Sequence, residues 1–383
     1  MEFDLQWLLV GLPVAFALGW LASRLDLRQV RRDSEASPKA YYKGLNLLLN
    51  EQQDKAIDAF IEAVQNDPDT TELHFALGNL FRRRGEFERA VRVHQHLLER
   101  ADLSETDRDR AQHALAQDFM KAGLFDRAEA AYKALEGTPF GTEARLALLN
   151  LYERSRDWRA AAETAAALER SGTGSFGTRI AHHWCELAQE ADARGNPDEA
   201  AAALKKAREA APHAARPMLM AGQRALKAGQ PTQALAHWRE LYLRDPASFH
   251  LVAADYAETA LACGETEVAR PLLTEAYARE PGLDLLRALA RLEGHASLGE
   301  SPRLLPHLQA DPTLSAAQAL LGRPAAEWCD ERASAVQAAI TKAARPLQRY
   351  RCAACGFEAQ RYFWQCPGCL GWDSFPPHHL EEL

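Results

Sequence analysis

Two hydrophobic patterns follow each other along the chain, and the first is an apolar run from Leu5 to Ala22. Gln6 is the only polar side chain in this run of eighteen residues. A helix rises 1.5 Å per residue, so the run reaches about 27 Å, which is enough to cross the hydrocarbon core of a bilayer. We therefore predict a transmembrane helix within residues 1–23.

The charges that flank this run predict its orientation. Acidic residues precede it at Glu2 and Asp4, whereas four arginines follow it within residues 24–32. The positive-inside rule places the arginine side, and with it the rest of the chain, in the cytoplasm. A cleaved signal peptide is the alternative, but no basic segment precedes the run and no convincing cleavage site follows it. Residues 24–37 form the predicted juxtamembrane linker.

The second pattern recurs about every 34 residues between residues 38 and 281. Each unit carries an alanine at the same place, and the seven alanines are separated by 34, 38, 33, 39, 34 and 35 residues. In five units a glycine stands five positions before the alanine, where a turn is expected. The alanines are Ala56, Ala90, Ala128, Ala161, Ala200, Ala234 and Ala269, and the glycines are Gly85, Gly123, Gly195, Gly229 and Gly264. This pattern resembles the tetratricopeptide repeat family, in which each unit is a pair of antiparallel helices.

Stacked repeats of this kind form a superhelix whose concave groove is lined by the first helix of each pair. In the first unit these positions are apolar, and they either bind a partner or pack beneath the membrane helix or the linker. In the second unit they are mostly polar, which suits an extended peptide or a helix. The candidate partner-binding residues are Tyr41, Leu45, Leu48, Leu49, Phe75, Asn79, Arg82 and Arg83. Small residues such as Gly44, Gly78 and Gly222 stand where the two helices of a pair must approach closely.

The period fades between residues 282 and 346, although apolar helical segments continue between Gly and Pro breaks. We expect degenerate helical repeats there that cap the array. Alanine dominates the apolar residues while Val and Ile are scarce, so composition also favours helices over strands. The formal charge is −8, with 45 basic against 53 acidic residues. That balance argues against a general nucleic-acid binder, which needs a basic face.

Residues 347–377 contain the strongest chemical signal in the chain. Cys352 and Cys355 form one CxxC pair, and Cys366 and Cys369 form a second pair after ten intervening residues. Each pair is typical of a knuckle that places two thiolates on one edge of a tight turn, so two facing knuckles make a tetrahedral four-sulfur site. The metal is iron, as in rubredoxin, or zinc, because both accept four thiolates. Two disulfides are unlikely chemistry for a cytoplasmic domain.

Seven aromatic residues surround this cysteine cluster, which is too many for so small a core to bury. They are Tyr350, Phe357, Tyr362, Phe363, Trp364, Trp372 and Phe375. Exposed apolar residues on a small module mark an interface, so we expect the module to dock against the repeats. The singletons Cys185, Cys263 and Cys329 are interpreted as small apolar residues. The predicted fold is therefore all-α, a tetratricopeptide-repeat superhelix with an N-terminal transmembrane helix and a small rubredoxin or zinc-ribbon-like metal knuckle domain.

The order of these parts is itself informative. The chain runs from one membrane helix through YYKGLNLLLNEQQDKAIDAF and LGNLFRRRGEFERAVRVHQHLL to YRCAACGF and WQCPGC near its end. This arrangement resembles the lipopolysaccharide assembly protein B family of Gram-negative bacteria. The resemblance implies a single-pass inner-membrane adaptor, with a periplasmic N-terminus, that presents the deacetylase LpxC to the protease FtsH for degradation. It also implies an inner-membrane signalling partner and assigns the four clustered cysteines as metal ligands.

Catalytic motifs are not apparent in the sequence, which contains no phosphate-binding loop and no nucleophile with an attendant base. We therefore interpret the chain as a non-catalytic adaptor. Two alternatives stay open at this point. One is a redox-active rubredoxin-like component whose metal cycles between oxidation states, and the other is a general scaffold for envelope-assembly enzymes. The oligomeric state is also open.

Overall fold

Paired α-helices make up most of the structure, which is a computed structural model that describes residue 16 and residues 42–47, 49–50, 52–66, 70–322 and 331–383. The described residues belong to two compact units, 1–155 and 156–383. The predicted membrane helix and linker lie outside the described residues, apart from Phe16. Within the described part of the chain, no helix is both long and apolar enough to cross a membrane.

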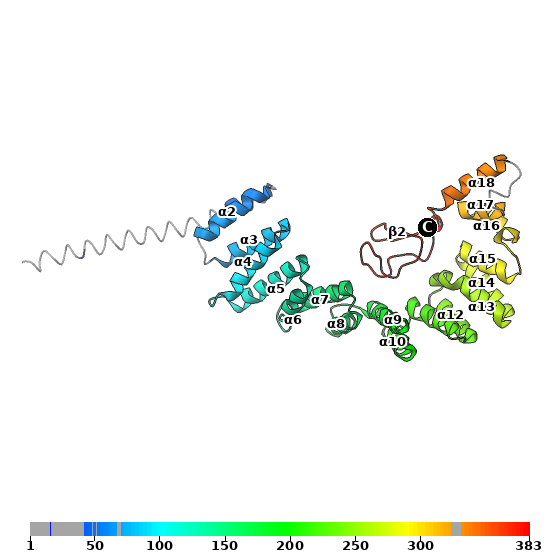
Figure 1. Cartoon of the computed structure of the whole chain (residues 1–383), viewed down its shortest axis with the longest axis horizontal. Coiled ribbons are helices and arrows are strands. Elements are labelled where there is room, and N and C mark those ends of the chain that lie inside the picture. The colour runs from blue at the N-terminus through cyan, green and yellow to red at the C-terminus, as the bar shows by residue number, and fades with distance from the viewer. Residues whose placement is uncertain (1–15, 17–41, 48, 51, 67–69, 323–330) are drawn as a thin grey trace, which may run out of the picture. The chain divides into compact units, whose positions relative to one another are not determined.

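The first unit is a succession of helices that pack on their neighbours in the chain (Figure 1). A helical segment at residues 42–47 precedes α2 (Gln53–Asn66), α3 (Thr71–Arg84), α4 (Phe87–Glu99), α5 (Glu105–Lys121), α6 (Phe125–Lys133) and α7 (Gly141–Ser155). Its core includes Phe60, Leu73 and Phe81, which lie between α2, α3 and α4. Each helix packs on the helices before and after it in the chain. The unit is therefore stabilised mainly by contacts between neighbouring helices.

The second unit continues the helical pairs and ends in the cysteine module (Figure 1). Its repeat helices are α8 (Trp158–Arg170), α9 (Gly177–Ala193), α10 (Pro197–Ala210), α11 (Ala215–Lys227), α12 (Pro231–Arg244), the 3-10 helix η1 (Ala247–Val252), α13 (Ala253–Cys263) and α14 (Thr266–Arg279). The capping region contains α15 (Leu283–Leu292), η2 (Leu298–Glu300), α16 (Leu304–Ala310), α17 (Leu314–Leu321) and α18 (Glu331–Ala344). The predicted helices between Gly and Pro breaks are thus confirmed among the described residues.

The sequence markers of the repeat occupy the positions that the pattern predicts. All seven marker alanines have 0% exposure, so each is a contact point between helices. The five turn glycines all adopt the left-handed conformation, with φ between 71° and 83°. A residue with a Cβ adopts this conformation only with strain, which is why glycine ends these helices. The predicted tetratricopeptide fold is therefore confirmed by burial and by backbone conformation.

Close approach between paired helices depends on small residues. A Cβ placed on Gly222 would lie 2.2 Å from Nε1 of Trp238, which is fully buried between α11 and α12. The same contact recurs in the first unit, where a Cβ on Gly78 would lie 2.5 Å from the His94 ring. The aromatic ring of one helix thus fills the space that the glycine of its partner leaves open.

The C-terminal tail packs back onto the capping helices, which the sequence did not predict. The carboxylate of Glu382, in η4 (Leu380–Glu382), accepts a hydrogen bond of 2.9 Å from the backbone N–H of Leu283. It therefore caps the first turn of α15. Burial opposes the charged form, but hydrogen bonds from His379 and from the Leu283 backbone lower the pKa of Glu382 to about 2. The tail is consequently anchored by a carboxylate that is ionised at neutral pH.

We predict that Gly222→Ala destabilises the second unit by about 1–3 kcal/mol, because the new methyl group forces Trp238 out of its packed position. Urea unfolding followed by Trp fluorescence measures the change. Gly174→Ala is the matched control, since its Cβ would make only an ordinary 3.6 Å contact with Phe176. Equal stability of the two variants would contradict this account of the helix pair.

Candidate metal centre

The four clustered cysteines lie on two knuckles that share one backbone pattern. In the first, the N–H of Gly356 donates to the carbonyl of Cys352 at 2.9 Å. In the second, the N–H of Leu370 donates to the carbonyl of Cys366 at 2.8 Å. The short strands β1 (Tyr350–Arg351) and β2 (Glu358–Ala359) pair in antiparallel register around the first knuckle. Each knuckle therefore holds its CxxC pair on a closed turn.

The second knuckle has a leucine where the first has a glycine. Pro367 and Gly368 lie in its turn, and the left-handed residue is Leu370, with φ of 59°, at the position equivalent to Gly356. Gly368 serves a different purpose, because a Cβ there would lie 3.4 Å from Cβ of Phe357 and 3.5 Å from Sγ of Cys355. Its N–H points to Sγ of Cys366 at 3.4 Å. The glycine thus lets the two knuckles approach each other.

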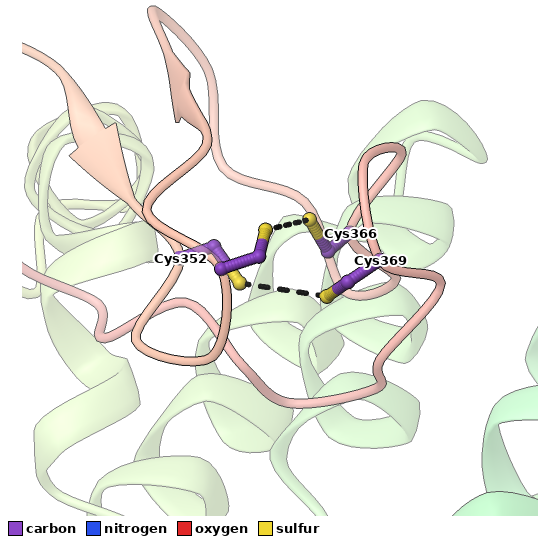
Figure 2. Close-up of side chains that lie close together, drawn as sticks. Cys352, Cys366 and Cys369 are labelled. Atoms are coloured by element: carbon purple, nitrogen blue, oxygen red, sulfur yellow. Dashed lines mark hydrogen bonds between the residues drawn. The ribbon is translucent and has the colours of Figure 1, made fainter. Parts of the chain in front are cut away.

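The sulfur atoms converge on one point. Sγ of Cys352 lies 3.8 Å from Sγ of Cys369, and Sγ of Cys355 lies 3.7 Å from Sγ of Cys366. Figure 2 shows the sulfurs of the two knuckles facing each other across these two distances. All four sulfurs lie within 4.8 Å of one another. A tetrahedral ion with metal–sulfur bonds of about 2.3 Å requires sulfurs about 3.8 Å apart, so the residues fit a four-thiolate metal.

Electrostatics within the cluster separate the two thiols of the first knuckle. Burial raises the pKa of Cys352, but hydrogen bonds from Ser374 and from the backbone of Cys355 and Ala354 outweigh it and lower the pKa to about 6. A backbone hydrogen bond from Phe357 lowers the pKa of Cys355, yet burial and the three neighbouring cysteines together raise it to about 12. A divalent ion removes this conflict, because its charge offsets four thiolates at once.

The centre is closed to substrates. Cys352 and Cys366 are buried, whereas Cys355 and Cys369 lie at the surface of the module. Four sulfur ligands fill a tetrahedral ion, which leaves no open position for water or a substrate. Phe375 packs under the buried cysteines together with Tyr350, Tyr362 and Phe363. The geometry is therefore that of a four-thiolate metal site, and a bound ion would supply folding energy to a small core.

Two of the remaining aromatic residues, Trp364 and Trp372, turn toward the repeats, whereas Phe357 is exposed. The Trp372 ring stacks on His182 of α9 at 4.7 Å and 14°, and it meets Trp158 of α8 edge-on at 6.1 Å. Trp364 packs against the core of the second unit. The predicted docking of the module is thus confirmed, and His182 and His183 act as part of this interface.

Polar contacts fix the register of the docked module. Asp373, with φ of 49°, places both carboxylate oxygens 2.8 Å from Nε2 of His182. The guanidinium of Arg216 lies 5.9 Å from the Trp372 ring, and it pairs with Glu186 at 2.6 Å. Arg216 is only 3% exposed. These contacts involve side chains from α9 and α11, so the module bridges neighbouring repeats.

The candidate partner-binding residues differ in their burial. Phe75 was expected in the groove, but it is 1% exposed and packs with Leu97 and Ala111, so that expectation is corrected. An apolar side chain at this position is buried by the next helix pair rather than offered to solvent. Leu45 is partly buried against the core of the first unit, whereas Leu49 is 85% exposed. Tyr41 and Leu48 lie outside the described residues.

The polar candidates of the second repeat remain nearer to solvent, but two of them have structural contacts, since Oδ1 of Asn79 accepts a hydrogen bond from Arg82. Arg82 donates to Asp118 at 2.8 Å, and Asp118 also contacts Nδ1 of His94. Both Asp118 and His94 are fully buried, so Arg82 takes part in an internal charge network that the sequence did not reveal. Asn79 is half-buried and Arg83 is exposed.

The single cysteines agree with their interpretation as apolar residues where they are described. Cys185 is fully buried in the core formed by α9 and α10. Burial raises the pKa of Cys185 to about 12, so its thiol stays protonated and unreactive. Cys263 is partly buried against the core of the second unit. Cys329 lies outside the described residues.

Fold and site together define a tetratricopeptide-repeat protein with a rubredoxin-like metal module. Residues 350–377 match a family described as the rubredoxin metal binding domain, and residues 73–109 and 113–176 match tetratricopeptide repeat families. Lipopolysaccharide assembly protein B of Escherichia coli K12 is 32% identical over 97% of this chain and 98% of its own length. The chain belongs to the lipopolysaccharide assembly protein B family.

Two further similar proteins are less identical in sequence. Lipopolysaccharide assembly protein B of Haemophilus influenzae is 26% identical over 99% of both chains. A tetratricopeptide repeat protein of Parabacteroides merdae covers 68% of this chain and 100% of its own, with a TM-score of 0.34 and 16% identity.

We predict that Cys366→Ser loses the thiolate-bound metal and unfolds the module, while the repeat helices keep their circular dichroism. Metal binding contributes a free energy of order 10 kcal/mol in comparable modules. A four-sulfur site that lacks one ligand loses part of this free energy. The thiolate-to-metal absorption of the cobalt-loaded protein measures the loss. Cys263→Ser serves as the control outside the cluster. Retention of the thiolate band by the Cys366 variant would show that the centre is not the one described.

We predict that Trp372→Ala weakens docking by about 2 kcal/mol or more, because the ring is a central aromatic anchor of the interface. Hydrogen exchange should then become faster in residues 350–375 and in α9, with the metal still bound. Arg361→Ala, an exposed residue of the same module, is the control. Unchanged protection in the Trp372 variant would mean that other contacts hold the module.

Proposed function

We propose that this protein is a non-catalytic adaptor in lipopolysaccharide assembly. The single observation that carries the proposal is membership of the family over 97% of the chain. Two structural features support it. Tetratricopeptide arrays offer extended surfaces for other proteins, and the metal centre has four sulfur ligands with no position for a substrate.

The proposed location is the inner membrane, with one spanning helix, a periplasmic N-terminus and a cytoplasmic bulk. The apolar run from Leu5 to Ala22 and the arginines that follow it support this location. Attachment to the membrane would confine the repeats to the layer in which a membrane protease works. Confinement raises the effective concentration of tethered partners without any added contact.

The proposed partners are the protease FtsH, the deacetylase LpxC and an inner-membrane signalling protein. In this scheme the adaptor presents LpxC to FtsH, and the signalling protein sets how much LpxC is degraded. Exposed polar positions of the second repeat, such as Arg83, are candidates for these contacts. Phe75 and Arg82 make contacts inside the repeats. They would therefore hold this surface in shape and would not touch the partner themselves.

Co-purification from native membranes tests the proposal together with the half-life of LpxC. Depletion of the adaptor should lengthen the half-life of LpxC, and the wild-type chain should restore it. FtsH and LpxC should both be recovered with the tagged wild-type chain. A half-life that does not respond to depletion would favour a general scaffold for envelope-assembly enzymes instead.

The metal provides a separate test against a redox role. If the module only holds structure, zinc-loaded and iron-loaded protein should control LpxC equally, because zinc has no redox chemistry. Activity of the iron form alone, with a reversible change in its visible spectrum, would support the redox alternative.

We predict that removal of residues 1–22 leaves folded repeats but abolishes control of LpxC. The described repeat helices bury their apolar faces against one another, whereas the tether would keep them beside a membrane protease. Replacement of the segment by an unrelated helix with the same orientation is the control and should restore control. Full activity of the truncated chain would contradict a positional role, and failure of the replacement would indicate specific contacts within the bilayer.

A further inference from the structure

Three metal-binding side chains gather where the C-terminal tail crosses the repeats. His250 comes from η1, Glu280 ends α14, and His378 comes from the tail before η4. One ligand atom of each residue lies within 4.8 Å of the ligand atoms of the other two. Nε2 of His378 lies 2.8 Å from Oε1 of Glu280, and the two histidine rings meet edge-on at 4.6 Å.

The ring of His250 is the buried member of this cluster. It is 5% exposed, and its Nε2 has no hydrogen-bond partner. A buried ring nitrogen without a partner is costly unless a ligand or water satisfies it. The unused nitrogen therefore indicates a missing ligand.

Carboxylates and basic groups both surround the cluster. Besides Glu280, the carboxylates of Glu382 and Asp284 lie nearby. Both lie 3.7 Å from Nδ1 of His379, and Asp284 also pairs with Arg287 at 3.0 Å. Glu280 is therefore the carboxylate that would contribute directly to a cation at the three ligand atoms.

We propose that His250, Glu280 and His378 form a second metal site that binds Zn²⁺. Two imidazoles and one carboxylate are a recurrent zinc set, with water in the fourth position. Bonds of about 2.0–2.1 Å require ligand atoms about 3.4 Å apart, so the 2.8 Å contact between His378 and Glu280 must lengthen when an ion enters. Glu280 and His378 are only partly buried, so rotation of their side chains can supply this adjustment.

Occupation of this site would join the tail to the repeat array. His250 and Glu280 are 30 residues apart on the repeats, whereas His378 lies 98 residues beyond Glu280 on the tail. An ion shared by all three would hold the tail in the position where Glu382 caps α15. The site is built from nitrogen and oxygen ligands and is separate from the four-sulfur centre, so the two are distinguishable by spectroscopy.

Titration of the full-length protein with Co²⁺ tests the proposal. The first equivalent should produce the thiolate charge-transfer band of the cysteine centre. A second equivalent should add visible ligand-field bands without further thiolate absorption. Titration with Zn²⁺ should displace this second equivalent and should slow hydrogen exchange in residues 376–383.

The variants His378→Gln and Glu280→Gln should each weaken the second site by about tenfold or more, with the thiolate band and circular dichroism unchanged. His237→Gln, a half-buried histidine outside the cluster, is the matched control and should bind two equivalents. Binding of only one equivalent by the wild-type chain would overturn the proposal. A second equivalent that both cluster variants retain would also overturn it, since the ion would then bind elsewhere.

Discussion

Close approach between paired helices is the constraint on which the rest of this structure depends. In three places a glycine of one helix lies against an aromatic ring of the next, and Gly222 with Trp238 is the clearest case, because the tryptophan fills the space that a side chain on the glycine would occupy. The marker alanines are fully buried at the other points of the repeat. The surfaces available to partners and to the metal module are positioned by these contacts.

The metal module depends on its contacts with the repeats for part of its stability. Its own core consists of a few aromatic rings under two cysteines, which is too little to fold without added energy. A metal bound by four thiolates supplies part of that energy, and burial of Trp364 and Trp372 against α9 and its neighbours supplies more. The module is consequently packed into the second unit and shares its core.

Periodic features were predictable from sequence, and long-range pairings were not. Alanine spacing and turn glycines predicted the helix pairs, because both follow from local geometry that recurs in every unit. The four cysteines were predictable because ligand spacing is short. By contrast, the burial of Phe75 depends on the following helix pair, and the Asp373–His182 contact joins residues from opposite ends of the second unit. No local pattern encodes such contacts. The left-handed Leu370 was also missed, because a leucine gives no signal of that conformation.

The distance along the chain between α9 and the module has a consequence for biosynthesis. His182 and Asp373 are separated by 191 residues. At about 5–20 residues per second, a ribosome needs about 10–40 seconds to make that stretch. During this interval the face of α8 and α9 that carries Trp158, His182 and His183 has no module to cover it. Nascent chains therefore present an aromatic surface that finished chains conceal.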